Sequence, residues 1–290
     1  MRSPSRPTTV TASTFRKMSD DVVLFEHRQP GIALITLNRP ERLNAWNGPL
    51  ATRYFELLDQ AAADPDVKVI VVTGAGRGFC AGADMETLQS IGASEGAGRG
   101  EGAGGAEAAA GGRPQYHTTL IPKPVIAAVN GACAGIGMVQ ALMCDMRFAA
   151  AGAKFTTAFS RRGLIAEYGM SWVLPRLVGT ARALDLLYSG RVFLAEEAAQ
   201  MGLVNEVVAP EHLLDRTLEF AAELATYASP TSMSVIKRQV YGDWDRGLVA
   251  ATDDAIEMMK ASLRRSDFKE GVASFLQKRP PAFAAVDEEA

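Results

Sequence analysis

The sequence predicts an α/β protein, because short β-branched segments alternate with a helical segment early in the chain and helices dominate its last third. Residues 31–37 (GIALITL), 67–73 (VKVIVVT) and 124–129 (PVIAAV) are apolar and bounded by Gly, Pro or Asn, as buried strands are. Between the first two, residues 49–63 repeat apolar side chains with the 3.6-residue period of an amphipathic helix. A chain of 290 residues, 48% of them hydrophobic, can bury a sizeable core.

The second half of the chain is predicted to be mostly helical. A Gly/Ala-rich turn at 131–137 leads into an apolar helical run that reaches Cys144, and a further strand is expected at 146–150. From residue 180 onward one short strand, at 202–208, interrupts a series of helices, which suggests a separate helical layer or subdomain. The predicted helices cover residues 181–188, 195–201, 211–227, 230–240, 245–264 and 267–278.

Two segments are predicted to lie outside the packed core. Residues 1–19 are expected to form a disordered tail; the first 18 are rich in Ser, Thr and Arg, superficially like a transit peptide, and Met18 is an alternative start. Of the 23 residues in 91–113, 16 are Gly or Ala, which predicts a mobile insertion. This insertion is either a tolerated surface loop or a cover over a substrate entrance.

Composition excludes several classes of function. A formal net charge of −3 gives no cationic excess for a nucleic acid, and no apolar run approaches the roughly 18–20 residues of a membrane span. Neither the cysteines nor the histidines have the spacing of a disulfide framework or metal site, so we expect a reduced, cytoplasmic protein without a metal. These residues are Cys80, Cys133, Cys144, His27, His117 and His212.

Two glycine-rich stretches invite a functional interpretation. Residues 73–84 follow a strand, but a dinucleotide-binding fingerprint would put its third glycine at Phe79, so a Rossmann fold is not supported. A Gly/Ala backbone can instead present free N–H groups, and the stretch at 134–137 opens a helix whose N-terminus is partially positive. Amides from 80–84 and 134–137 that converge on one oxygen would form an oxyanion hole. The alternative for each loop is a tight, closely packed turn.

Four motifs in order carry a resemblance to a known family. They are NRPERLNA at 38–45, FCAGAD at 79–84, NGACAGIG at 130–137 with CD at 144–145, and FKEGVASFLQKRPP at 268–281. Over roughly residues 20–283 the chain resembles the crotonase (enoyl-CoA hydratase/isomerase) superfamily. The resemblance implies a spiral of ββα repeats over 20–210 and a C-terminal α-helical trimerisation region over 211–290. It also implies an acyl-CoA substrate, no separate cofactor, and a homotrimer or dimer of trimers.

The resemblance also implies the site residues. The oxyanion amides would belong to Ala83 and Ile136, where Ile136 replaces a common glycine but keeps the backbone N–H. One lost oxyanion donor typically costs about 2.7–4 kcal/mol of barrier. The two glutamates typical of the family's hydratases fall here on Val139 and Phe159, so both are missing.

Glu167 is the single acid in residues 161–179, and it fills this gap. It matches the lone catalytic glutamate of the family's peroxisomal-type Δ3,Δ2-enoyl-CoA isomerases, where a related dehalogenase branch carries a nucleophilic aspartate. An apolar environment raises a carboxyl pKa, which suits proton transfer near neutral pH. The alternative is a loop acid paired with Arg161, Arg162 or Arg176.

We therefore predict double-bond isomerisation of an enoyl-CoA in fatty-acid metabolism, with Glu167 as the acid/base. Enoyl-CoA hydration ranks second, followed by acyl-CoA hydrolysis through an acyl-enzyme and by non-catalytic acyl-CoA binding. By resemblance, residues from four parts of the chain would contact the substrate or its CoA. These residues are Arg42, Leu43, Ala81, Asp84, Gly135, Phe275 and Lys278. For Lys278 the alternative is an exposed cation at a helix end.

Overall fold

The computed structural model describes residues 21–86, 89 and 110–286. The predicted tail at 1–19 and residues 91–109 of the predicted insertion lie outside these ranges. Within them, no helix is both long and apolar enough to cross a membrane.

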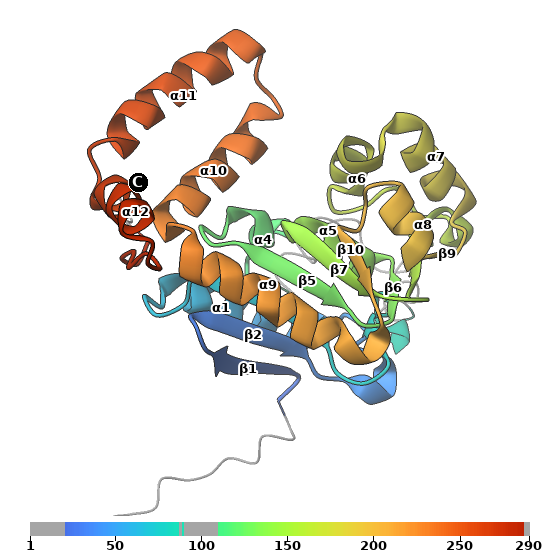
Figure 1. Ribbon diagram of the computed structural model, residues 1–290. Coiled ribbons are helices and arrows are strands. Elements are labelled where there is room, and N and C mark those ends of the chain that lie inside the picture. Colours follow the sequence, from blue (N-terminus) through green and yellow to red (C-terminus); the bar gives the residue numbers. More distant parts are fainter. Residues whose placement is uncertain (1–20, 87–88, 90–109, 287–290) are drawn as a thin grey trace, which may run out of the picture.

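The core is built on a six-stranded sheet with the strand order β1-β2-β3-β5-β7-β10 (Figure 1). β1 pairs antiparallel with β2, and every other neighbour in this sheet is parallel. β3 and β5 are buried along their whole length, which explains their continuous apolar sequences. The strands are β1 (Val23–Arg28), β2 (Ile32–Leu37), β3 (Val69–Gly74), β5 (Val125–Val129), β7 (Met146–Ala150) and β10 (Glu206–Val208).

A second, smaller sheet has the order β4-β6-β8-β9. β4 (Gly78–Cys80), β6 (Ala132–Ala134) and β8 (Lys154–Thr156) follow β3, β5 and β7 directly and run parallel to one another, while β9 (Phe193–Leu194) is antiparallel to β8. Each turn of the chain thus adds one long and one short strand, which is the spiral that the resemblance implies. The spiral brings the loops after β4 and β6 side by side.

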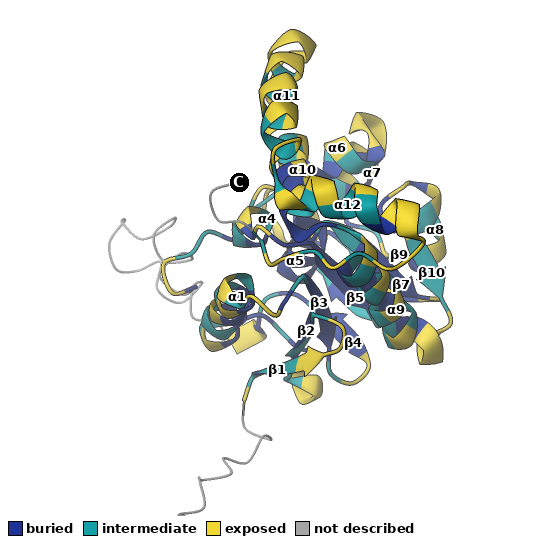
Figure 2. Ribbon diagram, turned by 60° about the vertical axis from the view of Figure 1, so that its left-hand side comes forward, coloured by how far each residue is buried: buried dark blue, intermediate teal, exposed yellow. Residues whose placement is uncertain are grey.

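Helices cover both faces of the large sheet. α1 (Gly48–Ala63) lies on one face, and α9 (Leu213–Tyr227) lies on the other across β2, β3, β5 and β7 (Figures 1 and 2). The Asn47 side chain caps α1 by accepting from the Leu50 N–H at 3.1 Å. The fully buried α5 (Ile136–Met143) contacts β7 of the large sheet and β4 and β6 of the small one, and α4 (His117–Leu120) packs against α5 and α1.

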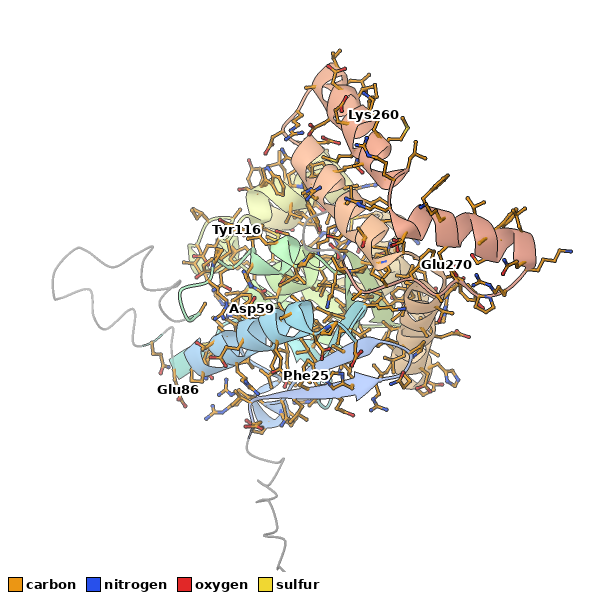
Figure 3. The ribbon with its side chains drawn as sticks, turned by 90° about the vertical axis from the view of Figure 1, so that its left-hand side faces the viewer. Phe25, Asp59, Glu86, Tyr116, Lys260 and Glu270 are labelled. Carbon is orange, nitrogen blue, oxygen red and sulfur yellow. The ribbon has the colours of Figure 1, made fainter. Side chains whose placement is uncertain are left out.

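The remaining helices form two groups. α6 (Met170–Val178), α7 (Thr180–Ser189) and α8 (Ala195–Gln200) pack beside the small sheet (Figure 1). α10 (Pro230–Asp243), α11 (Leu248–Ser262) and α12 (Ser266–Gln277) form an arm that projects from the core; Lys260 and Glu270 mark its last two helices in Figure 3. No residue of α11 is buried.

The structure confirms the α/β class and most predicted elements. The strand predicted at 202–208 is shorter than expected, because Gly202 has a φ of +80° and only Glu206–Val208 pairs with β7. β1, α4, α6 and the short strands β4, β6, β8 and β9 were not predicted. Two or three residues are too few to show a period, β1 is apolar only in its first half, and Pro175 interrupts the helical pattern of α6. Short 3-10 turns at Pro40–Arg42, Ser160–Arg162 and Pro210–His212 were also not predicted.

Candidate active site

The loop after β4 leaves the amide of Ala83 free. Trp46 forms an isolated bridge opposite Ala83, in which the Trp46 N–H donates to the Gly82 carbonyl at 2.8 Å and the Asp84 N–H donates to the Trp46 carbonyl at 2.9 Å. Because the residues on either side of Ala83 make these bonds, its own N–H faces away from Trp46. Within the described ranges the Ala83 N–H has no hydrogen-bond acceptor.

The second amide belongs to Ile136, the first residue of α5. Its N-cap, Gly135, has a φ of +50°, which turns the chain from β6 into the helix. The first amides of a helix have no intrahelical acceptor and carry partial positive charge. The Ile136 side chain is buried, and no acceptor for its N–H is found in the described part of the chain.

The two loops touch, and glycines permit the contact. A Cβ at Gly82 would lie 3.2 Å from the Ala134 carbonyl oxygen, and one at Gly137 would lie 2.3 Å from the Cys80 carbonyl oxygen. The backbone of α5 is therefore packed directly against β4. Close packing and free amides coexist, so the two interpretations of these glycine-rich loops do not exclude each other.

Asp84 is held by an arginine that the sequence analysis did not single out. The Arg39 guanidinium lies 2.9 Å from the Asp84 carboxylate, and its hydrogen bond lowers the pKa of that carboxyl group. Arg39 also donates to the Ala45 carbonyl at 2.6 Å. The structure thus gives the Asp84 side chain an internal bracing role, while ligand contact at Asp84 stays a prediction.

The structure brings Arg42, Leu43 and Ala81 together beside the Ala83 loop. The Ala81 N–H donates to the Leu43 carbonyl at 3.0 Å. Asn44, buried and with a φ of +56°, fixes this turn by donating to the Gly78 carbonyl at 2.8 Å. Arg42 is exposed, 3.2 Å from the Glu86 carboxylate, and is accessible to an anionic group.

Glu167 sits in the loop that leaves the small sheet and enters α6. The Gly135 N–H donates to the Thr156 carbonyl at 3.0 Å, so β8, which leads to this loop, runs beside the turn that carries Ile136. The Glu167 carbonyl accepts from the Met170 N–H at 3.0 Å. The side chain is half-buried, and this burial raises the pKa of its carboxyl group.

The three arginines proposed as alternative partners of Glu167 bind elsewhere. Arg161 donates to the Ser189 carbonyl at 2.7 Å, and Arg162 donates to the Ala158 carbonyl at 3.3 Å. The Arg176 guanidinium lies 3.4 Å from Asp245. Within the described ranges Glu167 has no ion pair, so it is a carboxylate without a bound counter-charge.

Val139 and Phe159 are the two residues that the family resemblance aligns with the hydratase glutamates. Val139 and Phe159 are both buried. Next to Val139, the buried Gln140 donates through Nε2 to the Gln115 side-chain oxygen at 2.9 Å. Its Oε1 has no partner among the described residues, which leaves a buried acceptor one helical turn beyond Ile136. Sequence reasoning missed this group, because a single glutamine in an apolar run carries no motif.

Phe275 and Lys278 lie on the projecting arm. Phe275 is 83% exposed, and Lys278 ends α12 with a φ of +53°. In the described part of the chain no hydrogen bond or ion pair joins α12 to the loops of Ala83 and Ile136. One chain therefore brings Ala81, Ala83 and Ile136 together, and their contact with Phe275 and Lys278 stays a prediction.

Two free amides on touching loops and an unpaired carboxylate of raised pKa suit one class of chemistry. The amides can stabilise negative charge on a carbonyl oxygen, and the carboxylate can accept the proton whose removal creates that charge. Groups of three or more His, Cys, Asp or Glu side chains that could hold a metal ion are not found among the described residues.

Comparisons with known proteins identify the family. The family model "Enoyl-CoA hydratase/isomerase" matches residues 27–286. The 1,2-epoxyphenylacetyl-CoA isomerase of Escherichia coli (strain K12) is 36% identical over 263 residues, which cover 90% of this chain and 97% of that protein.

Two solved structures are also similar. An enoyl-CoA hydratase, EchA12_1, from Mycobacterium marinum is 56% identical, with a TM-score of 0.65 over 78% of this chain and 100% of that one. A probable enoyl-CoA hydratase/isomerase from Mycobacterium abscessus is 31% identical, with a TM-score of 0.81 over 91% of this chain and 98% of that one. The chain belongs to the enoyl-CoA hydratase/isomerase family and has its crotonase fold.

Proposed function

We propose that this protein isomerises the double bond of an enoyl-CoA thioester. The observation that carries the proposal is the carboxylate of Glu167, which has no ion pair in the described structure and whose pKa is raised by burial. The two residues that the family resemblance aligns with the hydratase glutamates, Val139 and Phe159, are apolar and buried. One base suffices for a proton shuttle. Hydration needs one group to activate water and another to protonate the α carbon.

The proposed reaction moves one proton between two carbons of a 3-enoyl-CoA. The Glu167 carboxylate removes a proton from the α carbon, and the electron pair delocalises into the thioester, which places negative charge on its oxygen. The Ala83 and Ile136 amides stabilise this dienolate. The protonated Glu167 then returns the proton to the γ carbon, and the double bond ends between the α and β carbons.

The substrate's CoA part is proposed to lie along the loop of Arg42, Leu43 and Ala81, close to Asp84 and Gly135. Phe275 and Lys278 would reach CoA from a neighbouring subunit of a homotrimer or a dimer of trimers, because the arm that carries them projects from its own core (Figure 3). The apolar side chains exposed on α11 and α12 support such an assembly. We place the reaction in cytoplasmic fatty-acid metabolism.

Hydration of a 2-enoyl-CoA is the second candidate, supported by the hydratase name of the Mycobacterium marinum relative. Ultraviolet absorbance of the conjugated thioester distinguishes the two reactions. The wild-type protein should raise the absorbance with a 3-enoyl-CoA and leave crotonyl-CoA unchanged. A fall in absorbance with crotonyl-CoA would instead indicate hydration. No absorbance change with either substrate would leave thioester hydrolysis and non-catalytic binding as the candidates to assay.

A further inference from the structure

One face of α10 contacts both the segment after α5, the helix that begins with Ile136, and α6, the helix that follows Glu167. Lys237, Tyr241 and Trp244 recur at helical spacing and point toward the core from one side of the helix and its C-cap. Lys237 is 9% exposed, although it carries a charge. A buried cation is costly unless it is paired and hydrogen-bonded. The partners of Lys237 therefore show which elements this face of α10 is bound to.

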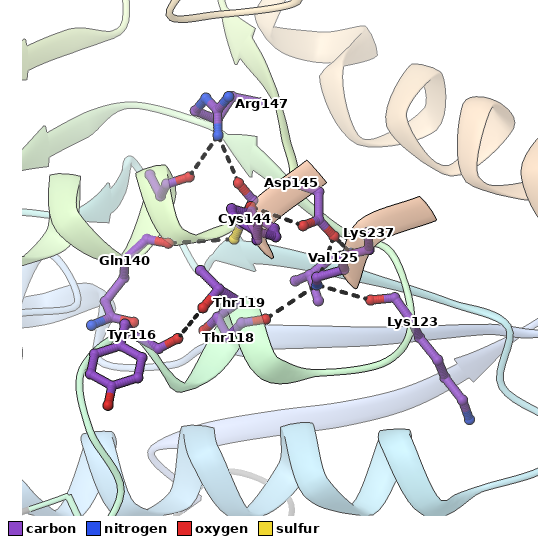
Figure 4. A network of polar contacts seen from close by, with 12 residues as sticks. Tyr116, Thr118, Thr119, Lys123, Val125, Gln140, Cys144, Asp145, Arg147 and Lys237 are labelled. Carbon is purple, nitrogen blue, oxygen red and sulfur yellow. Dashed lines mark hydrogen bonds and ion pairs between the residues drawn. The ribbon is translucent and has the colours of Figure 1, made fainter. Parts of the chain in front are cut away.

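At one end, this face is bound to Asp145, two residues after the end of α5. The Lys237 ammonium lies 2.9 Å from Asp145 Oδ2, and the Tyr241 hydroxyl donates to Asp145 Oδ1 at 3.1 Å. Asp145 also accepts from the Val125 N–H at 2.7 Å, which ties it to β5 (Figure 4). Lys237 donates further to the Thr118 carbonyl at 3.3 Å and so reaches α4.

The ion pair fixes α10 in register. A shift of α10 along its axis would separate Lys237 from Asp145 and leave the buried ammonium without its counter-charge, which is costly. Asp145 is the second residue after α5, and Ile136 is the first residue of α5. This end of α10 is therefore held in place relative to the helix that carries the Ile136 amide.

At the other end, the same face stacks on α6. The Trp244 ring lies 4.6 Å from the Trp172 ring, centroid to centroid, in an edge-to-face arrangement. The Arg176 guanidinium lies 4.3 Å from the Trp172 ring centroid and 5.6 Å from that of Trp244. Tyr241 touches Trp244 with ring centroids 5.2 Å apart, so the contact continues from Asp145 to α6.

Trp172 is close in sequence to the proposed base. It lies in the first turn of α6, and the Met170 N–H in that turn is bonded to the Glu167 carbonyl at 3.0 Å. The preceding residues, 160–165, are all exposed, and the side chains of Ser160 and Arg161 donate to the Tyr188 and Ser189 carbonyls at the end of α7. The position of Glu167 therefore depends on the placement of α6.

We propose that α10 is a strap that sets the position of Glu167 relative to the Ile136 amide, and that Trp244 is a positioning residue for the reaction. The strap is the set Lys237, Tyr241 and Trp244, bound to Asp145 at one end and to Trp172 and Arg176 at the other. Its effect on turnover rests on the proposed function. Its effect on the Glu167 loop does not.

The kinetic test compares three variants of the full-length chain. Trp244→Leu removes the ring contact and should lower kcat about 10- to 100-fold, with KM changed less than about threefold, because misplacing a catalytic group by about 1 Å costs up to about 10²-fold. Trp244→Phe keeps a ring and should retain most of kcat. Val240→Ala, on the exposed side of α10, is the control and should behave like wild type.

A double-mutant cycle separates a shared role from general loss of stability. Because Trp172 and Trp244 act through one contact, Trp172→Leu combined with Trp244→Leu should lose no more kcat than the worse single variant. Multiplicative losses in the double variant, or a kcat for Trp244→Leu equal to that of wild type, would overturn the proposal.

Hydrogen exchange tests the strap without any substrate. In Trp244→Leu, amides of residues 164–173 should exchange faster than in wild type, while amides of β5 should be unchanged. Equal exchange at 164–173 would overturn the strap. If exchange rises there but the wild-type protein isomerises no 3-enoyl-CoA, the strap stands and the proposed reaction fails.

Discussion

Glu167 combines partial burial with the absence of a paired cation in the described structure, and both features determine its chemistry. Desolvation disfavours the carboxylate, and no nearby arginine offsets this effect. The neighbouring Tyr168 is affected by the same environment: burial and, to a smaller extent, the Glu167 carboxylate raise the pKa of its hydroxyl group. The result is a base that holds a proton more firmly than an ordinary glutamate does.

The pH dependence of turnover follows from this raised pKa. The reactive form of Glu167 is the carboxylate, so kcat/KM for a 3-enoyl-CoA should fall as the pH drops through its pKa. The midpoint of this acid limb should lie above the ordinary glutamate value of about 4.3. A pH–rate profile measures it, and a midpoint at or below that value would contradict a desolvated base.

The cysteines should be unreactive in the folded protein. Cys80, Cys133 and Cys144 are buried, and burial raises the pKa of Cys80 and Cys144 to about 12. The thiolate is the reactive form, so a disulfide reagent should label none of them at neutral pH. Titration with such a reagent before and after denaturation checks this, and rapid labelling of the native protein would show that the core around β4 and β6 opens.

At the scale of elements, the packing of α5 against β4 determines the oxyanion geometry. Gly137→Ala would place a methyl group 2.3 Å from the Cys80 carbonyl oxygen, so α5 must move. We expect a loss of about 1–3 kcal/mol in unfolding free energy, together with a lower kcat. Chemical denaturation and steady-state kinetics measure both effects.

Gly242→Ala is the matched control for that substitution. Gly242 lies in α10, and a Cβ there would meet no atom within 4 Å. This variant should gain up to about 1 kcal/mol of stability, because alanine favours a helix more than glycine does. A Gly137→Ala variant as stable and active as Gly242→Ala would show that α5 need not touch β4.

The strands β2, β3, β5 and β7 and the main helices could be predicted from the sequence, because periodicity is a local signal; β1 was missed. The assignment of the two amides to Ala83 and Ile136 rests on the family resemblance and stays a prediction. Residues whose roles depend on distant partners are not predictable in this way. Arg39 gains its role only when the spiral brings Asp84 beside it, and Trp244 only when α10 reaches α6. The three-residue strands β4, β6 and β8 also depend on distant partners, because each becomes a strand only by pairing with a neighbouring turn of the spiral.

At the scale of the whole molecule, the arm of α10 to α12 exposes many large apolar side chains that the chain's own core does not cover. Its exposed apolar residues on α11 and α12 are Leu248, Val249, Ile256, Met259, Leu263, Phe268, Val272, Phe275 and Leu276. Contiguous patches of this kind mark protein–protein interfaces.

Light scattering should therefore give three or six times the chain mass of 30.9 kDa. The double variant Leu248→Glu/Ile256→Glu should dissociate, because charges would replace buried apolar contacts. Val192→Glu, at an exposed apolar position outside the arm, is the control and should keep the mass of the wild type. A wild-type protein that stays monomeric at high concentration would contradict the proposed assembly.

The measurement that tests the central claim most directly is the rate of 3-enoyl-CoA isomerisation by Glu167→Gln, compared with wild type and with the exposed control Glu223→Gln. Glutamine keeps the size of the side chain but cannot accept the proton, so the account predicts a fall in kcat of about 10²–10⁴-fold for Glu167→Gln. It predicts no change for Glu223→Gln. An isomerisation rate for Glu167→Gln within a few-fold of wild type would contradict the assignment of Glu167 as the base.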